Sequence, residues 1–106
     1  MIKIIHLSLI LSLFLFQEQS CLASGSRDYC NYELKDGYRV VYRGQTNNLR
    51  RRAQEHLRDG KNFTHMKKIG NAKTKKGALK AEKASLKTYR ESHGGNNPKY
   101  NRTNHG

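Results

Sequence analysis

CNYELKDGYRVVYR, residues 30–43, is the stretch that decides the fold of this chain. Two short runs rich in Tyr, Leu and Val, at residues 30–35 and 38–43, are separated by Asp36-Gly37. An Asp-Gly pair between two β-prone runs is the strongest short-range signal for a β-hairpin. The sequence therefore predicts two antiparallel strands that meet at a tight turn.

A helix is expected downstream, over residues 48–58. Residues 44–48 have the composition of a turn, and Thr46 or Asn47 can cap the helix that follows. Apolar residues then recur every four positions, at Leu49, Ala53 and Leu57. Asp59-Gly60 ends the pattern, because glycine readily adopts the backbone conformation that closes a helix.

The rest of the chain predicts one more strand and one longer helix. Residues 63–69 form a weak strand pattern with Gly70 and Asn71 as its exit. Thr74 can cap a helix over residues 75–91, and a polar tail follows. The order strand, strand, helix, strand, helix predicts an α/β (α+β) domain, with a small three-stranded antiparallel sheet flanked by helices.

The N-terminal residues have the pattern of a signal peptide, predicted to span residues 1–23. The apolar run over residues 4–16 is shorter than the roughly 20 residues that a membrane-spanning helix needs. Small residues precede Ser24, where cleavage is expected, while an uncleaved anchor and a lipid on Cys21 are the alternatives. We expect an exported protein, periplasmic or secreted, whose mature part (residues 24–106) is one monomeric domain without a stable membrane anchor.

Cleavage before Ser24 would also decide the state of the cysteines. The chain contains two, and removal of the leader would leave Cys30 alone, so that no internal disulfide could form. Cys30 is then expected to be a small buried hydrophobic residue.

The charge of the chain indicates the class of its partner. The predicted leader holds one basic and one acidic residue, so the formal net charge of +13 stays on the mature domain. A charge of this size implies a polyanionic partner. Nucleic acid, an anionic membrane and an acidic polysaccharide all satisfy it.

Arg52 and His56 are the first candidate catalytic pair, because a spacing of four places their side chains on one face of the helix. A guanidinium can neutralise charge on a phosphate, and an imidazole can relay a proton near neutral pH. The other arginines of this helix, Arg50, Arg51 and Arg58, are expected on its solvated face, where they would contact the phosphate backbone.

Glu82 is the next candidate, because it falls inside the apolar stripe of the last helix. That stripe is formed by Ala78, Leu79, Ser85, Leu86 and Tyr89. A carboxylate on a core-facing side is unfavourable unless it is paired, hydrogen-bonded or bound to a metal. It can form a structural ion pair, for example with Arg52, or bind one Mg²⁺ or Mn²⁺ ion, since these ions prefer hard oxygen ligands.

The six tyrosines also allow two interpretations. In a basic domain without tryptophan they can pack within the sheet or act as stacking platforms for the bases of a single strand. A phenol is a poor base unless nearby cations lower its pKa, which Arg52 together with a metal could do. Tyr32 and Tyr42, on the two strands of the predicted hairpin, are the candidates.

Taken in order, these residues resemble the GIY-YIG nuclease superfamily over essentially the whole mature domain. Cys30-Asn31-Tyr32 stands in the place of the first motif, of which only the Tyr is retained, and Tyr42-Arg43-Gly44 resembles the second. Residues 44–56 resemble the loop and helix that carry the catalytic Arg, here Arg52, and the His or Tyr position, here His56. Residues 77–82 resemble the segment with the metal-binding Glu, and Pro98-Lys99-Tyr100-Asn101 resembles the closing motif, whose Asn supports the site.

This resemblance implies a divalent-metal-dependent endonuclease that hydrolyses phosphodiester bonds of DNA, with one ion per site and no small-molecule cofactor. By the resemblance, Glu82 binds the metal and Arg52 stabilises the pentacovalent phosphate. Tyr32 activates or positions the attacking water, and Tyr42 and His56 assist proton movement, although either tyrosine can be the base. The supporting residues are Gly44 and Asn101. The residues expected to contact DNA are Arg43, Arg50, Arg51, Arg58 and Lys99, and single-stranded DNA is a candidate substrate.

Two other functions compete with this one. A basic nucleic-acid-binding module that has lost catalysis would bind with salt sensitivity and would not cut. The presence of Arg52, His56 and Glu82 together argues against it. A cationic membrane-active or cell-wall-binding protein needs an amphipathic surface with bulky apolar residues, and the mature helices lack Trp and Phe.

Overall fold

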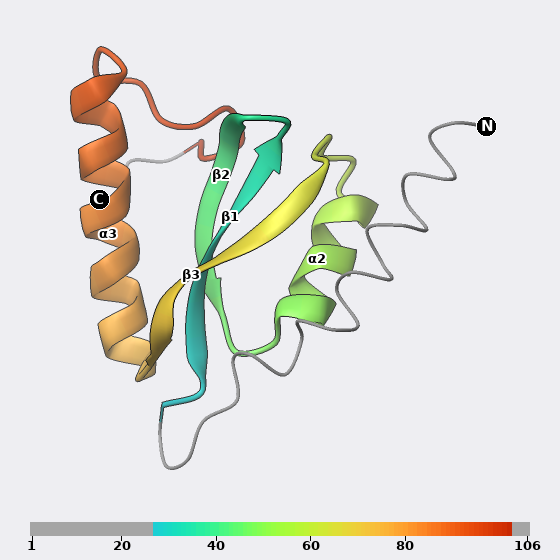
Figure 1. Ribbon diagram of the computed structural model, residues 1–106, viewed down its shortest axis with the longest axis vertical. Coiled ribbons are helices and arrows are strands. Elements are labelled where there is room, and N and C mark those ends of the chain that lie inside the picture. Colours follow the sequence, from blue (N-terminus) through green and yellow to red (C-terminus); the bar gives the residue numbers. More distant parts are fainter. Residues whose placement is uncertain (1–26, 103–106) are drawn as a thin grey trace.

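The computed structural model describes residues 27–102, so the predicted signal peptide and its cleavage site lie outside the described part of the chain. The elements follow the order β1 (Tyr29–Asp36), β2 (Arg39–Thr46), α2 (Leu49–Arg58), β3 (His65–Lys73) and α3 (Lys75–Ser92). The strands form one antiparallel sheet in the order β2-β1-β3, with α2 and α3 on either side of it (Figure 1). The predicted α+β fold with a three-stranded antiparallel sheet is confirmed. Within residues 27–102, no helix has the length and apolar character needed to cross a bilayer.

The hairpin that the sequence predicts forms around Asp36-Gly37. Asp36 pairs with Arg39, which leaves Gly37 and Tyr38 as the two turn residues. Gly37 has a φ of 65°, a left-handed conformation that glycine adopts without steric strain. β2 continues beyond the predicted range, because its residues keep pairing with β1 as far as Thr46, opposite Cys30.

The two faces of the central strand β1 differ in chemistry because successive side chains point to opposite sides. Cys30, Tyr32 and Leu34 are buried in the hydrophobic core. The other members of that core come from β2, α2 and the start of β3: Val41, Leu49, Ala53, Phe63 and Met66. Asn31 and Glu33, also buried, are the intervening residues of β1. The core therefore lies between the sheet and α2, while the other face of β1 is polar.

α3 is joined to that polar face by hydrogen bonds as well as by apolar packing. The side-chain amide of Asn31 donates to the carbonyl of Ala78 at 2.9 Å. Arg43 Nη1 donates to the carbonyl of Ser85, also at 2.9 Å. Ala78 and Leu86 are the buried residues of the helix. Leu79, predicted to belong to the apolar stripe, is instead 40% exposed, so that prediction is wrong.

The helix caps agree with the sequence in one case and differ in the other. Thr74 accepts a hydrogen bond from the backbone N–H of Gly77 at 3.0 Å and caps α3 as predicted. Asn48, rather than Thr46 or Asn47, caps α2 through its side chain, which accepts from Arg51 N at 3.0 Å. The Thr46 hydroxyl accepts from the backbone N–H of Asn48 at 3.1 Å instead.

Cys30 differs from its expected state. The residue is buried, as predicted, but it is disulfide-bonded. The prediction that no internal bridge is possible assumed that cleavage removes Cys21, which is the other cysteine of the chain and lies outside the described residues.

Candidate active site

Three of the predicted catalytic side chains meet at one point of the fold. Tyr32 comes from β1, Tyr42 from β2 and His56 from the last turns of α2. The Tyr32 hydroxyl and His56 Nε2 are 2.6 Å apart, a short hydrogen bond. The ring centroids of Tyr42 and His56 are 4.6 Å apart, and those of the two tyrosines are 6.1 Å apart. The packing of the hairpin against α2 thus joins residues that are far apart in the sequence.

Gly44 makes this close approach possible. It pairs with Tyr32 across the two strands. A Cβ atom at Gly44 would lie 2.8 Å from Tyr42 Cε1 and 2.9 Å from the Tyr32 hydroxyl oxygen. Both distances are shorter than real Cβ contacts allow, so only glycine fits without moving the tyrosines. The supporting role expected for Gly44 therefore has a steric reason.

His56 is neutral in this environment. Its side chain is fully buried, and burial lowers its pKa to about 3, with further lowering by the cations of Arg52 and Lys61. Within residues 27–102, its Nδ1 atom has no hydrogen-bond partner. A neutral imidazole can accept a proton on one nitrogen, so His56 can accept the hydrogen bond of the Tyr32 phenol.

Tyr32 is a weaker candidate for the base than the sequence suggests. Its side chain is 1% exposed, and burial raises its pKa well above the usual value. The neighbouring Tyr42 raises it further, and the cation of Arg52 opposes this effect without cancelling it. Tyr32 is therefore a protonated phenol that donates a hydrogen bond.

Arg52 lies beside both tyrosines. Burial disfavours its cation, but hydrogen bonds to the side chains of Glu55, Tyr42 and Tyr32 raise its pKa overall, so its charge is permanent. Its ion-pair partner on the same helix is Glu55, with Arg52 Nη1 2.9 Å from Glu55 Oε1. The pKa of the Glu55 carboxyl is lowered, chiefly by this hydrogen bond. Glu55 lies three residues after Arg52 and holds its guanidinium in place. It was not identified as a site residue from the sequence.

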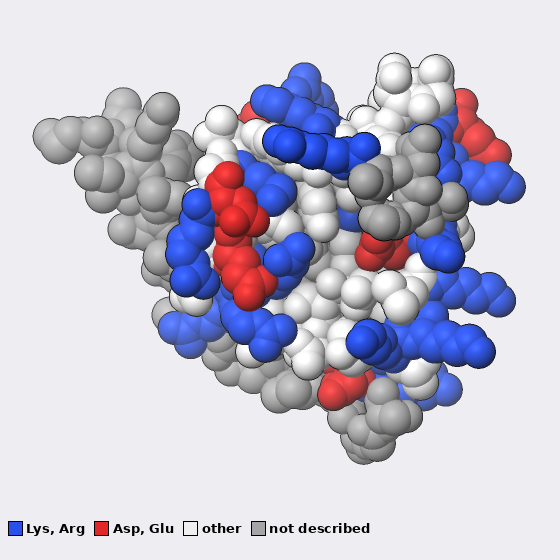
Figure 2. All heavy atoms as spheres, turned by 180° about the vertical axis from the view of Figure 1, so that it is seen from behind, with Lys and Arg blue, Asp and Glu red and all other residues white. Residues whose placement is uncertain are grey.

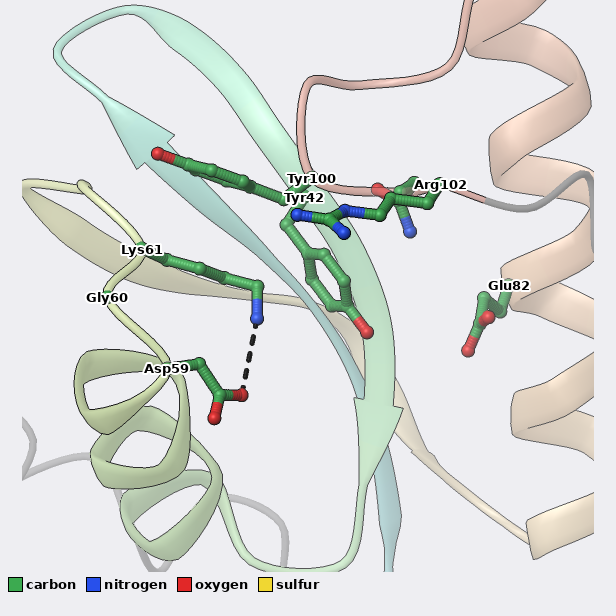
Figure 3. Close-up of a pocket in the computed structure, with 8 residues that line it drawn as sticks. Tyr42, Asp59, Gly60, Lys61, Glu82, Tyr100 and Arg102 are labelled. Carbon is green, nitrogen blue, oxygen red and sulfur yellow. Dashed lines mark hydrogen bonds and ion pairs between the residues drawn. The ribbon is translucent and has the colours of Figure 1, made fainter.

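A cavity of about 650 Å³ opens next to this cluster. Tyr42 and Glu82 line it from β2 and α3, and both side chains point into it (Figure 3). Glu82 lies four residues from the buried Ala78 and four from the buried Leu86, which accounts for its half-buried position. The predicted place of Glu82 on the core-facing side of the helix is therefore correct.

The cavity has two cationic residues that the sequence did not identify, Lys61 and Arg102. Lys61 Nζ is 3.4 Å from Asp59 Oδ2 and 5.5 Å from the centre of the Tyr42 ring. The Lys61 side chain is only 17% exposed. Lys61 follows the end of α2 and Arg102 belongs to the C-terminal tail, so only the folded chain brings them to Tyr42 and Glu82.

Asn101 attaches the C-terminal tail to the edge of β2. Its Oδ1 accepts from Arg43 N at 2.8 Å, and its Nδ2 donates to the carbonyl of Arg43 at 2.9 Å. The backbone N–H of Tyr100 adds a hydrogen bond to the carbonyl of Val41 at 2.8 Å. Tyr100 and Arg102 therefore line the cavity because Asn101 holds the tail in place.

Glu82 suits a hard divalent cation. Its carboxylate shares the cavity with the Tyr42 hydroxyl, and Mg²⁺ commonly takes one or two protein carboxylates while it keeps several waters. No group of three or more His, Cys, Asp or Glu side chains that could enclose a metal occurs in residues 27–102. A metal here would therefore depend on Glu82, water and substrate rather than on a protein cage.

The residues predicted to contact DNA do not all lie on one side. Arg50, Arg51 and Arg58 are carried by α2, and Lys99 is exposed in the tail. Figure 2 shows Lys and Arg side chains, with patches of Asp and Glu among them, around a central region of uncharged atoms on the face opposite to that of Figure 1. Arg43 lies elsewhere, because its neighbour Tyr42 faces the cavity and successive side chains of a strand alternate.

Arg43 is held by α3 and the sheet. Its Nε atom is 3.4 Å from Glu33 Oε2, and its guanidinium lies 5.4 Å from the centre of the Tyr89 ring. Together with the bond to the Ser85 carbonyl, these contacts give Arg43 a structural role.

No protein-family model matches this chain, and no similar protein or solved structure was found among curated proteins and known structures.

Proposed function

We propose that this protein is an exported, divalent-metal-dependent endonuclease of the GIY-YIG type that hydrolyses phosphodiester bonds of DNA. The observation that supports this most is the convergence of Tyr42, Arg52 and His56 beside a cavity whose opposite wall carries Glu82. The surrounding cations fit a polyanionic substrate. The motif order of the sequence, which resembles that superfamily, agrees with this arrangement.

Tyr42 is the tyrosine that contacts the attacking water in this proposal. It lines the cavity, whereas Tyr32 is 1% exposed. Tyr32 does not contact the water in this proposal. Its hydroxyl is hydrogen-bonded to His56 and its ring packs against that of Tyr42, so it positions these two residues. The burial of Tyr32 and the position of Tyr42 in the cavity wall support this choice between the two tyrosines.

Arg52 supplies a fixed positive charge to the reacting phosphate. The pKa of Arg52 is raised, so its guanidinium stays charged at any pH at which the protein would act. The ion pair with Glu55 limits the rotation of the Arg52 side chain. Such preorganised charge stabilises the transition state because it needs no rearrangement during the reaction. Lys61 is a second cation on the wall of the same cavity and can hold a neighbouring phosphate oxygen.

Glu82 would hold one Mg²⁺ or Mn²⁺ ion. When bound, such an ion polarises a phosphoryl oxygen and stabilises the charge on the leaving oxygen. The carboxylate is suited to this because it projects from α3 into the cavity, facing Tyr42 (Figure 3).

The proposal is tested by incubation of the purified protein with single-stranded and double-stranded DNA, with Mg²⁺, with Mn²⁺ and with EDTA. We expect cutting that requires metal and that Glu82→Gln abolishes. Glu91→Gln is the matched control, because Glu91 is an exposed acid of the same helix, and it should cut normally. Binding of DNA without cutting under every metal would favour the catalytically inactive binding module instead.

A second variant tests the arginine. Arg52→Ala should lower the cleavage rate by about 10²–10³-fold, as expected when one preorganised charge is removed from a transition state. Lys87→Ala removes an exposed cation of α3 that lines none of the described cavities, so it is the control and should change the rate little. Circular dichroism of both variants verifies folding, and an active Arg52→Ala protein would remove Arg52 from the mechanism.

A further inference from the structure

Two neighbouring cavities lie on the α3 side of the sheet, outside the candidate active site. One, of about 280 Å³, is formed where the β1–β2 turn and the end of α3 come together, with Tyr38, Arg39 and His93 in its wall. The other, of about 430 Å³, is bounded by β3 and α3 and includes Lys67. Arg43 and Thr88 line both, so the cavities adjoin along α3. We call this surface the α3 groove, defined by Tyr38, Arg39, Arg43, Lys67, Thr88 and His93.

One end of the α3 groove presents aromatic rings. Tyr38 is 99% exposed at the tip of the hairpin, which lies at the same end of the molecule as the end of α3 (Figure 1). His93 is exposed as well and stacks on Tyr89, with ring centroids 3.7 Å apart and planes within 3° of each other. A single exposed tyrosine needs no explanation by itself. Here it shares a cavity with a second, preformed aromatic stack.

The remainder of the α3 groove is cationic. Arg39 and Lys67 are exposed, and among the described residues that line the two cavities Glu33 is the only acid. Glu33 is neutralised within the groove, since its carboxylate lies 3.4 Å from Arg43 Nε. The groove therefore offers positive charge along its length and exposed aromatic rings at one end. Proteins hold unpaired strands with this combination, cations along the backbone and rings under the bases.

We propose that the α3 groove binds a single-stranded segment of nucleic acid, with bases stacked on Tyr38 and His93 and phosphates held by Arg39 and Lys67. A base within a duplex is already stacked on both faces and has none to offer to Tyr38, so the groove selects unpaired nucleotides. This inference rests on the proposed function for the identity of the ligand as DNA. It adds that the bound DNA is single-stranded, and that the protein binds it at a second site besides the candidate active site.

Binding is measured separately from cutting. The Glu82→Gln protein in EDTA is titrated with a fluorescein-labelled oligothymidylate and with a labelled duplex of the same length, and Kd is read from fluorescence anisotropy. Adding Tyr38→Ala should weaken binding of the single strand by about 5- to 150-fold, the loss expected for one base–aromatic stack. Tyr38→Phe retains the ring and should bind as the parent does. Duplex binding should be the same for all three proteins.

The cationic part of the α3 groove is tested through salt dependence. Lys67→Ala should reduce the slope of log K against log salt for the single strand by about 0.7, the value for one lost phosphate contact. Lys80→Ala, an exposed lysine of α3 that lines neither cavity, is the matched control and should leave the slope unchanged.

Different results overturn the two proposals. Unchanged single-strand binding by Tyr38→Ala, or an equal loss for the duplex, would refute the α3 groove as a single-strand site even if the protein cuts DNA. Tyr38-dependent binding without metal-dependent cutting would refute the nuclease and leave the groove standing.

Discussion

Gly44 has no reactive group, yet the positions of the two tyrosines depend on it. Its Cβ would collide with the ring of Tyr42 and the hydroxyl of Tyr32, and the latter is already fixed by its bond to His56. The family resemblance predicts only that Gly44 supports the site. The close approach of the two tyrosines is a physical reason for glycine at this position. Glu55 and Lys61 show the opposite case: both are ordinary charged residues in the sequence, and only their neighbours in space give them a role.

Gly44→Ala should lower both the stability of the fold and the cleavage activity. The added methyl group must displace a buried tyrosine, so we expect a loss of about 1–3 kcal/mol in the free energy of unfolding and a severe loss of cutting. Both are measured on one preparation, by urea denaturation and by DNA cleavage.

Gly95→Ala is the control for that experiment. Gly95 has a φ of 87°, and no described atom lies within 4 Å of its would-be Cβ, so alanine there brings backbone strain without a clash. It should lower stability and leave cutting unchanged. A Gly44→Ala protein that cuts as fast as the parent would contradict the steric argument.

His56 should make stability depend on pH. Its pKa is about 3 in the folded protein and near 6.5 when unfolded, so between these values only the unfolded chain binds the proton. Stability should therefore fall as pH drops below 6.5, by at most about 1.4 kcal/mol per pH unit from this residue. Urea denaturation at a series of pH values between neutrality and the folded-state pKa measures the slope.

His56→Gln removes the titrating group and should flatten the slope by that amount. His93→Gln leaves His56 in place and is the matched control for the same substitution at an exposed histidine. Identical slopes for the parent and His56→Gln would mean that His56 is not held neutral.

At the scale of elements, local signals predicted the hairpin and both helices, but the ends of elements depend on partners. Gly70 and Asn71 were expected to end the third strand, yet β3 continues to Lys73. Tyr29 pairs with Lys73 and Asn31 with Ile69, so β3 carries extra residues opposite β1. Gly70, with a φ of 71°, accommodates this bulge. A bulge is set by pairing across the sheet, which a single strand pattern does not reveal.

The tail offers a prediction at the same scale. Asn101→Ala removes both side-chain hydrogen bonds to Arg43, and each is typically worth about 0.5–1.5 kcal/mol. The tail should detach from β2, and the Arg43 amide should exchange with deuterium faster, as measured by NMR. Cutting should fall because Tyr100 and Arg102 leave the cavity wall. Asn96→Ala, exposed in the same tail, should behave as the parent, and slow exchange at Arg43 in Asn101→Ala would contradict the clamp.

For the whole molecule, composition predicted one basic domain, and the α+β architecture confirms the predicted class. The candidate site was predictable where it follows helical spacing, as for Arg52 with His56 and for Glu82. It was not predictable where segments distant in the sequence meet: the wall that Lys61 and Arg102 form needs the end of α2 and the tail to lie together. The same holds for the burial of Tyr32, which the alternation of β1 alone did not decide.

The leader makes a prediction for the intact protein. Cleavage before Ser24 would remove Cys21 and leave Cys30 as the one cysteine of the exported product. We therefore expect a product that begins at Ser24 and whose mass does not change on reduction. Intact-mass spectrometry with and without reductant measures both. A product that retains Cys21 and gains about 2 Da on reduction, the mass of two thiol hydrogens, would contradict this cleavage position.

The unequal faces of β1 have a consequence for cooperativity. α2 packs on the apolar side, whereas α3 buries only Ala78 and Leu86 and relies on polar bonds such as that of Asn31. Regions with little buried apolar surface open at lower free energy than the global transition, so we expect α3 to be able to open without unfolding of the sheet and α2. Glu82 belongs to α3, whereas Tyr42 belongs to the sheet that packs on α2. Any ligand that bridges them binds only the closed form, and the occupancy of the site and the docking of α3 become one coupled equilibrium.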